Sequence, residues 1–344
     1  MFDNQSITKI IFAFCLIFLA TFVGKKFKNY IDNGNDSSDY ELIKEYLLNE
    51  DSLNHNNKPN LWIHTKYELN ARKWKSFGSR TSCDLNQPYI HLTIKSIIHE
   101  CGNDFNVCLI DDNTFEKLVP DWKYNMETIA EPRRTQYREL GMISLLYYYG
   151  GVIVPNSFLC FKNLNMLYNN EMKTPFVSEN INHTASMGLN FIPDIHFMGA
   201  KKKCPIIKEL LDYIIARNGR PHYTAEYELM GDLSRWCMTK IKERKMKMLS
   251  ADNIGVMNKK KKVIMIEDLF EEQHLDLSKS AIGLYIPADE ILRRPKFQWF
   301  ASMPAENIIE GNYILAKHLI RTLARIEYDA DSPTNNKNNN IFTP

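Results

Sequence analysis

The stretch that decides the fold is Leu145 to Phe158, LLYYYGGVIVPNSF. Large apolar and aromatic residues run into a pair of glycines, and a short β-branched run, Val152 to Val154, follows. Glycine is a frequent helix stop, and a short uninterrupted apolar run is typical of a strand buried on both faces. The stretch therefore predicts a helix that leads into a core strand, with polar residues at the end of that strand.

Strand and helix patterns also alternate on the N-terminal side of this stretch. Leu61 to His64 and Phe105 to Ile110 are short apolar runs suited to buried strands. Apolar residues on one helical face predict a helix that begins at Pro88 and ends before Gly102, and a second helix is expected over Arg133 to Tyr149. This alternation predicts an α/β domain with a largely parallel sheet covered by helices on both faces.

The ends of the expected strands mark a candidate pocket. In sheets of this kind, ligands bind beyond the carboxyl ends of the strands. The residues found there are His64 after the first strand, Asp111 and Asp112 after the second, and Asn156 and Ser157 after the third. These five residues are the substrate-binding candidates that the strand pattern gives.

The same stretch resembles the centre of glycosyltransferase family 32 and the related capsular polysaccharide synthesis proteins. In that family a helix ends in Leu-Leu-Tyr-x-Tyr-Gly-Gly, a buried strand follows, and an Asp-x-Asp pair stands at its end. LWIHT, FNVCLIDDNTFEKLVPDW and DIHFMGAKKKCPIIKELLDYI resemble further family segments, so the resemblance covers residues 61 to 217. It implies a GT-A-like fold, a nucleotide sugar as donor, and transfer of a hexose to a glycan or glycoconjugate acceptor.

The chain departs from the family pattern where the family binds its metal. Pro155, Asn156 and Ser157 occupy the Asp-x-Asp positions. Of the family's Asp-Leu-x-Arg pattern before the diglycine, Glu139 keeps the acid, and Met142 replaces the arginine. Sites for Mg²⁺ or Mn²⁺ hold the ion mostly through charged oxygens, which an amide and a hydroxyl do not supply. We therefore expect weak metal binding here and assign no metal ligand.

Three interpretations of Pro155-Asn156-Ser157 stay open. The chain is a metal-independent transferase in which Lys or Arg stabilises the diphosphate, or it is a catalytically inactive relative that serves as a binding or structural scaffold. In the third interpretation, Asp111 and Asp112 form the metal pair. For the first interpretation, the candidate cations are Arg133, Arg134 and Lys201 to Lys203.

Three further residues have both a structural and a functional interpretation. Glu139 is the candidate contact to the nucleotide sugar, but an acid on an arginine-rich helix is commonly an exposed member of surface ion pairs. His64 and His196 are lone histidines in apolar settings, where a hydrogen-bonded structural role is the commoner one. His196 is of more interest because it precedes Phe197-Met198-Gly199, which matches the acceptor-side turn of the family.

Composition fits a large globular domain. The 344 residues are 44% hydrophobic and 24% charged, with a net charge of +2. The basic runs lack interleaved aromatic residues, so nucleic-acid binding has no support. The seven cysteines contain no Cys-x-x-Cys pair and do not form a zinc pattern, and Cys101 and Cys108 are expected to be buried thiols.

The N-terminus predicts a membrane anchor. Ile10 to Gly24 is uncharged and lies between lysines, although it is shorter than the roughly 20 residues of a typical spanning helix. A cleaved signal peptide is the alternative. We expect an anchor over 1–28, a stem over 29–60, a globular domain over 61–328 and a disordered tail over 329–344.

The orientation of that anchor stays open. Lysines after the apolar segment favour a cytoplasmic domain. The resemblance instead implies a single-pass protein of the endoplasmic reticulum or Golgi type with a lumenal domain. In that case Asn35 and Asn182, each in an Asn-x-Ser/Thr sequence, would be glycosylation acceptors.

Overall fold

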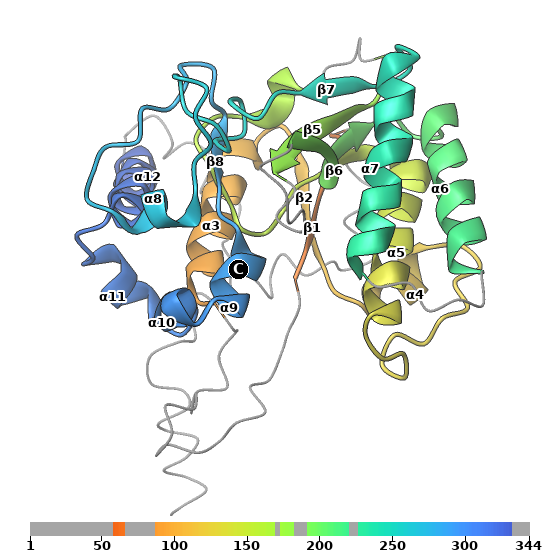
Figure 1. Cartoon of the computed structure of the whole chain (residues 1–344), viewed down its shortest axis with the longest axis horizontal. Coiled ribbons are helices and arrows are strands. Elements are labelled where there is room, and N and C mark those ends of the chain that lie inside the picture. The colour runs from red at the N-terminus through yellow and green to blue at the C-terminus, as the bar shows by residue number, and fades with distance from the viewer. Residues whose placement is uncertain (1–57, 66–86, 169–172, 182–190, 220–225, 332–344) are drawn as a thin grey trace, which may run out of the picture. The chain divides into compact units, whose positions relative to one another are not determined.

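A six-stranded sheet lies at the centre of the part of the chain that the computed structural model describes, residues 58–65, 87–168, 173–181, 191–219 and 226–331 (Figure 1). Its strands lie in the order β2-β1-β3-β6-β5-β7. β6 is antiparallel to both of its neighbours, whereas the other pairs are parallel. The strands are β1 (Asn60–His64), β2 (Asn106–Ile110), β3 (Gly151–Ile153), β5 (Phe176–Ile181), β6 (Phe191–Ala200) and β7 (Lys247–Leu249). The predicted α/β class with a mostly parallel sheet is confirmed.

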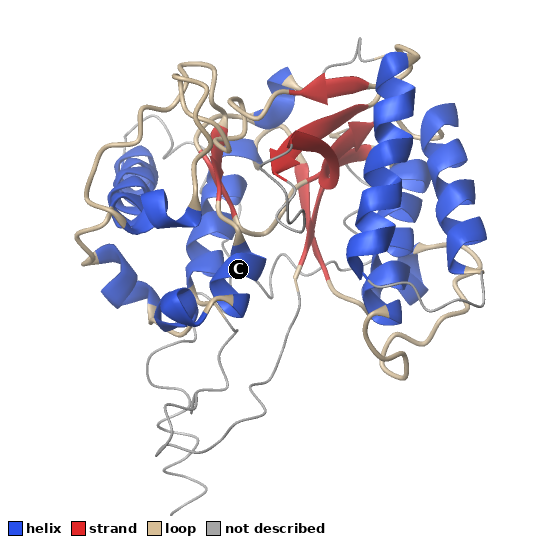
Figure 2. Ribbon diagram, in the orientation of Figure 1, coloured by secondary structure: helices blue, strands red, loops and turns tan. Residues whose placement is uncertain are grey.

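Helices lie on both sides of this sheet (Figure 2). On one side α5 (Arg133–Tyr149), α6 (Pro205–Asn218) and α7 (Glu226–Lys242) pack together. On the other side α3 (Tyr89–Cys101) packs against α12 (Ile314–Asp331) and a two-stranded sheet of β4 (Phe158–Cys160) and β8 (Gly283–Tyr285). The shorter helices are α4 (Thr114–Leu118), η3 (Leu164–Met166), α8 (Ile266–Phe270), α9 (Ala288–Arg293), η4 (Pro295–Phe297), α10 (Gln298–Ala301) and α11 (Ala305–Ile309).

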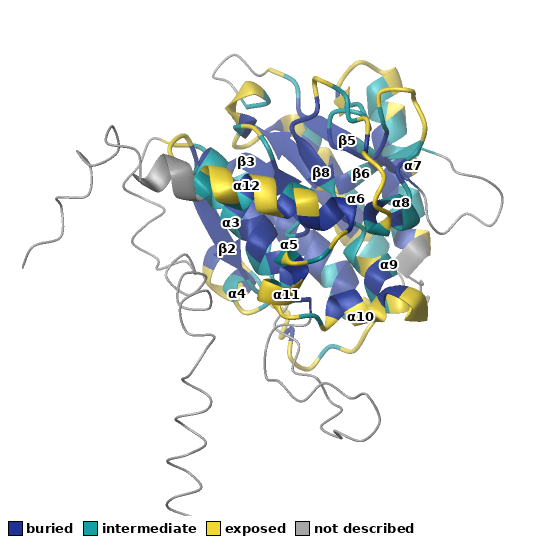
Figure 3. Ribbon diagram, turned by 90° about the vertical axis from the view of Figure 1, so that its left-hand side faces the viewer, coloured by how far each residue is buried: buried dark blue, intermediate teal, exposed yellow. Residues whose placement is uncertain are grey.

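The elements around the diglycine match the sequence expectations closely. α5 has the predicted bounds, α3 begins after Pro88 and ends at Cys101, and β3 lies one residue earlier than predicted. Met142, Cys101 and Cys108 are buried, and the two thiols are free. α12 continues to Asp331, beyond the predicted end of the domain at residue 328, and shows one buried and one exposed face (Figure 3).

The turn from α5 into β3 has room for backbone only. Gly150 and Gly151 have φ angles of 72° and 112°, which residues other than glycine rarely adopt. A Cβ on Gly151 would lie 2.0 Å from the carbonyl oxygen of Asn60 on β1. The indole Nε1 of Trp62 donates to the carbonyl of Gly150 over 2.9 Å. The turn is thus fixed against β1 at both of its glycines.

Most of the predicted anchor, stem and tail, residues 1–57 and 332–344, lies outside the described residues, as does Asn182. Among the residues that are described, there is no helix with the length and apolar character needed to cross a membrane.

Replacing Gly151 and Gly231 by alanine should change stability in opposite directions. Gly151→Ala combines a φ of 112° with a backbone clash, so it should lower the free energy of unfolding by more than about 2 kcal/mol. Gly231 lies inside α7, where an added Cβ would meet the Arg235 guanidinium at an ordinary contact distance of 3.8 Å, so Gly231→Ala should raise it by up to about 1 kcal/mol. Urea denaturation of both variants measures this, and equal effects would contradict the close approach at Gly151.

Candidate functional site

The sheet brings the predicted site residues to one edge. β1 pairs in parallel with β2 and β3, so His64, Asp111 and Pro155 come at the carboxyl ends of three adjacent strands. β6 runs in the opposite direction beside β3, so its early residues Asp194 and His196 arrive at the same edge. Residues far apart in the sequence therefore meet where ligands bind in sheets of this kind.

Asp112 forms the centre of one charged cluster at this edge. Its carboxylate accepts two hydrogen bonds from the Arg138 guanidinium, 2.7 Å from Nε and 2.6 Å from Nη2. The Nε2 atom of His64 lies 2.9 Å from the same carboxylate, and the His64 ring stacks on Phe115. Arg138 is buried, and Glu131 Oε1 lies 3.8 Å from its Nη1 atom. The cluster ties the ends of β1 and β2 to the first half of α5.

His196 forms the centre of a second cluster, between two carboxylates. Its Nδ1 atom lies 2.6 Å from Asp194 Oδ1, and its Nε2 atom lies 3.1 Å from Glu139 Oε1. Since a carboxylate only accepts, both ring nitrogens are suited to donate, which is the protonated form of histidine. Glu139 is buried, so its interpretation as an exposed surface acid is wrong, while 46% of the His196 side chain remains exposed. The imidazole is thus the solvent-facing member of the cluster.

The electrostatics of this second cluster favour its charged form. Partial burial lowers the pKa of His196, but Asp194 and Glu139 more than offset this and hold its pKa well above the usual 6.5. Burial raises the pKa of Asp194, but the nearby His196 more than offsets this and lowers the pKa to about 2. The pKa of Glu139 is likewise lowered, because His196 outweighs the burial. Two carboxylates and one imidazolium leave the cluster with a net negative charge.

The remaining predicted residues have mainly structural contacts. Asp111 accepts hydrogen bonds from the backbone N–H and the hydroxyl of Thr114, which fixes the start of α4. The carbonyl of Asn156 accepts a hydrogen bond from the Thr93 hydroxyl over 2.5 Å, and Ser157 is buried. The turn at Pro155-Asn156-Ser157 is therefore held by α3 on one side.

The residues present do not fit a divalent metal. In the described ranges, no three side chains of His, Cys, Asp or Glu are placed to hold an ion together. Asp111 and Asp112, the pair of the third interpretation, are engaged by Thr114 and by Arg138 with His64. A carboxylate that already forms a bidentate pair with arginine is a poor ligand for Mg²⁺ or Mn²⁺.

Two members of these clusters were not predicted as site residues, Arg138 and Asp194. The signal for Arg138 is its spacing, since it precedes Met142 by four residues and so lies one helical turn earlier on the same face. Arg133 and Arg134 were the arginines considered instead, but Arg134 donates to the backbone carbonyls of Ile129 and Glu127. Asp194 lies two residues before His196, which its carboxylate contacts, but the third member of that cluster, Glu139, is distant in the sequence.

Comparison with protein-family models and with curated protein sequences gives no match. Among solved structures, the chain is similar to one described as "PaToxG Glycosyltransferase", with 15% identity. The similar region covers 63% of this chain and 80% of that one, with a TM-score of 0.34. At this identity and TM-score, neither the family nor the activity follows from the likeness.

Removing the charge of Asp112 should destabilise the fold. Asp112→Asn leaves the buried Arg138 without its bidentate partner and should lower the free energy of unfolding by about 3 kcal/mol. This is the low end of the cost of breaking a buried ion pair, because Glu131 remains near Arg138. Asp212→Asn removes the same charge from an exposed ion pair with Lys208 and should cost less than about 0.5 kcal/mol. Urea denaturation of the two variants measures both costs, and similar values would rule out a structural role for the Asp112 cluster.

The His196 cluster should give a pH-dependent contribution to stability. Because folding raises the pKa of His196, its contribution is complete below pH 6.5 and is lost as the pH rises through the higher folded-state pKa. The difference in unfolding free energy between the unmodified chain and His196→Gln should therefore be largest near pH 6 and shrink towards pH 10. A pH series of urea denaturation curves measures it, and a difference that does not change with pH would show that His196 is not held in its charged form.

Proposed function

We propose that this chain is a glycosyltransferase-like protein that binds a nucleotide sugar at the carboxyl edge of its sheet. The observation that carries the proposal is the cluster of Asp194, His196 and Glu139 at that edge. Glu139 is the residue that the family resemblance assigns to the nucleotide sugar, and it is a buried carboxylate that faces a half-exposed imidazole. The carboxylates of this cluster are suited to the hydroxyls of a sugar, because their oxygens can accept further charge-assisted hydrogen bonds while both N–H groups of the imidazolium are engaged.

The proposed reaction is transfer of a hexose from the nucleotide sugar to a glycan or glycoconjugate by a GT-A-like enzyme. In this proposal Asn156 and Ser157 line the diphosphate region, where they offer neutral hydrogen-bonding groups. The positive charge of His196 offsets one of the two carboxylate charges near the leaving group, and the proposed reaction uses no metal ion. Arg138 acts through Asp112 as a positioning residue, because its guanidinium is buried and already paired. The proposal also includes an N-terminal membrane anchor, which rests on the sequence of residues 10–24 alone.

A catalytically inactive scaffold is the second candidate, and one observation favours it. The two acids of the His196 cluster outnumber its one cation, so the cluster is net negative and opposes an approaching diphosphate. A protein of this kind would retain a sugar-binding or partner-binding surface and lack turnover. The two candidates differ in catalysis, so one set of measurements separates them.

Nucleotide sugars should raise the melting temperature of the full chain if the proposed site exists. Uridine and guanosine diphosphate hexoses are tested one by one, with and without Mn²⁺, because a ligand that binds only the folded state stabilises it. Glu139→Gln should lower the affinity for the nucleotide sugar about tenfold, because it removes one charge-assisted hydrogen bond. Glu306→Gln makes the same chemical change at an exposed position and should leave the affinity unchanged.

The outcomes of this experiment distinguish the candidates. Stabilisation together with hydrolysis or transfer of the donor sugar supports the transferase. Stabilisation that depends on Glu139, without turnover under either condition, supports the scaffold. No stabilisation by any nucleotide sugar, with or without Mn²⁺, removes nucleotide-sugar binding as the function of this edge.

A further inference from the structure

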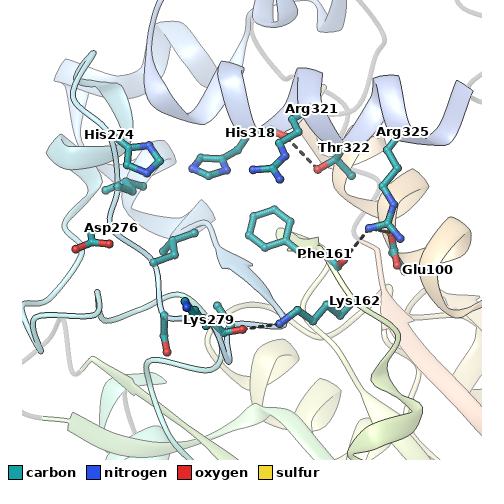
Figure 4. Close-up of a pocket in the computed structure, with 14 residues that line it drawn as sticks. Glu100, Phe161, Lys162, His274, Asp276, Lys279, His318, Arg321, Thr322 and Arg325 are labelled. Carbon is teal, nitrogen blue, oxygen red and sulfur yellow. Dashed lines mark hydrogen bonds and ion pairs between the residues drawn. The ribbon is translucent and has the colours of Figure 1, made fainter. Parts of the chain in front are cut away.

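A cavity of about 560 Å³ lies at the other end of α3 from the sheet edge described above (Figure 4). Thr93, near the start of α3, contacts the turn at Asn156, whereas Glu100, near its end, lines the cavity. The other walls come from the segment after β4, the loop before β8, and α12. A volume of this size lies within the roughly 300–1,000 Å³ of small-molecule sites.

The wall of this cavity is basic. Its one buried acid, Glu100, is already engaged, because Arg325 lies 3.2 Å from its carboxylate. Across the cavity, Lys162 donates to the backbone carbonyl of Lys279 over 2.7 Å. Within the described residues, neither Arg321 nor Lys279 forms an ion pair with a carboxylate. The cations that line the cavity are Lys162, Lys279, Arg321 and Arg325, and the acids are Glu100 and Asp276.

His318 on α12 adds a buried polar atom that lacks a partner. Its Nε2 atom is inaccessible to solvent and makes no hydrogen bond among the described residues. One side of its ring lies against Phe161, with ring centroids 5.6 Å apart, and Figure 4 shows Arg321 and His274 on either side of it. Burial, together with His274 and Arg321, lowers the pKa of His318 to about 4. Such a nitrogen is unfavourable when unpaired, and in the tautomer that carries the proton on Nε2 an anionic acceptor in the cavity would satisfy it.

A phosphate group matches these donors better than other common anions. It carries close to two negative charges and three acceptor oxygens, enough for a guanidinium, an ammonium and an imidazole N–H at once. Phe161, Leu275 and Ala281 give the same cavity an apolar part, on which a carbon skeleton can rest. The combination favours a phosphate ester over an inorganic ion alone.

We propose that this cavity binds a phosphate monoester, with Arg321, Lys279 and Nε2 of His318 as donors and the Phe161 ring against the organic part. The ester is either a small molecule in solution or the headgroup of a lipid, since both present the same chemistry. This site is separate from the proposed nucleotide-sugar site and does not depend on it.

Calorimetric titration of the full chain with phenyl phosphate tests this proposal. We expect saturable binding with one site, at constant ionic strength. Arg321→Gln and Lys279→Gln should each weaken it about tenfold, because each removes a charge-assisted hydrogen bond. Both side chains are exposed, so the variants should fold, which circular dichroism checks. Lys260→Gln is the matched control on an exposed lysine outside the cavity and should not change the affinity.

A second arm identifies the source of the phosphate. Vesicles of phosphatidylcholine with and without phosphatidic acid are sedimented with the protein. Binding to phosphatidic acid that is lost in Arg321→Gln supports a lipid headgroup, and binding of phenyl phosphate alone supports a soluble ester. Absence of both, or affinities that are the same in Arg321→Gln and Lys260→Gln, would overturn the proposal. Glu139→Gln should leave phenyl phosphate binding unchanged, so this result is independent of the nucleotide-sugar test.

Discussion

The close approach of the α5–β3 turn to β1 is the constraint on which the rest of this structure depends. A 2.0 Å gap between the Cβ position of Gly151 and the carbonyl of Asn60 leaves space for glycine alone. This contact sets where β3 begins, and the parallel pairing of β1 with β3 then sets which residues follow at the sheet edge. The same turn fixes the end of α5, and this sets the position of Arg138 and Glu139 on that helix relative to the strand ends.

The resulting sheet edge carries many charged side chains, and most of them are paired with one another. Arg138 neutralises Asp112, and His196 lies between Asp194 and Glu139. Among Asp112, Arg138, Asp194, Glu139 and His196, the imidazole is the most exposed, so it is the member of these pairs best placed to meet a ligand. A site of this composition offers more hydrogen-bonding groups for the hydroxyls of the proposed sugar than charged ligands for a metal ion.

The sequence predicted what depends on local pattern. The bounds of α5, the start of α3 and the class of the sheet follow from spacing, glycine and proline, and these were right. Glu139 was harder to interpret, because its burial depends on β6, which returns antiparallel from much later in the chain. The cavity beside α12 was not predicted at all, since Phe161, Lys279 and His318 come together only through tertiary packing and show no common motif.

The placement of His196 within a strand has a consequence for how such a site evolves. Residues after a strand end, such as Asp112 and Asn156, move whenever the following loop gains or loses a residue. His196 lies inside β6, at an irregularity in its pairing with β5. The pairs on either side, Asp194 with Ser178 and Met198 with Val177, fix this segment, so insertions in the loops beyond the strand do not displace it. A lineage that reshapes its loops to accept new substrates would keep this imidazole in place, while the residues that follow the strand ends change position.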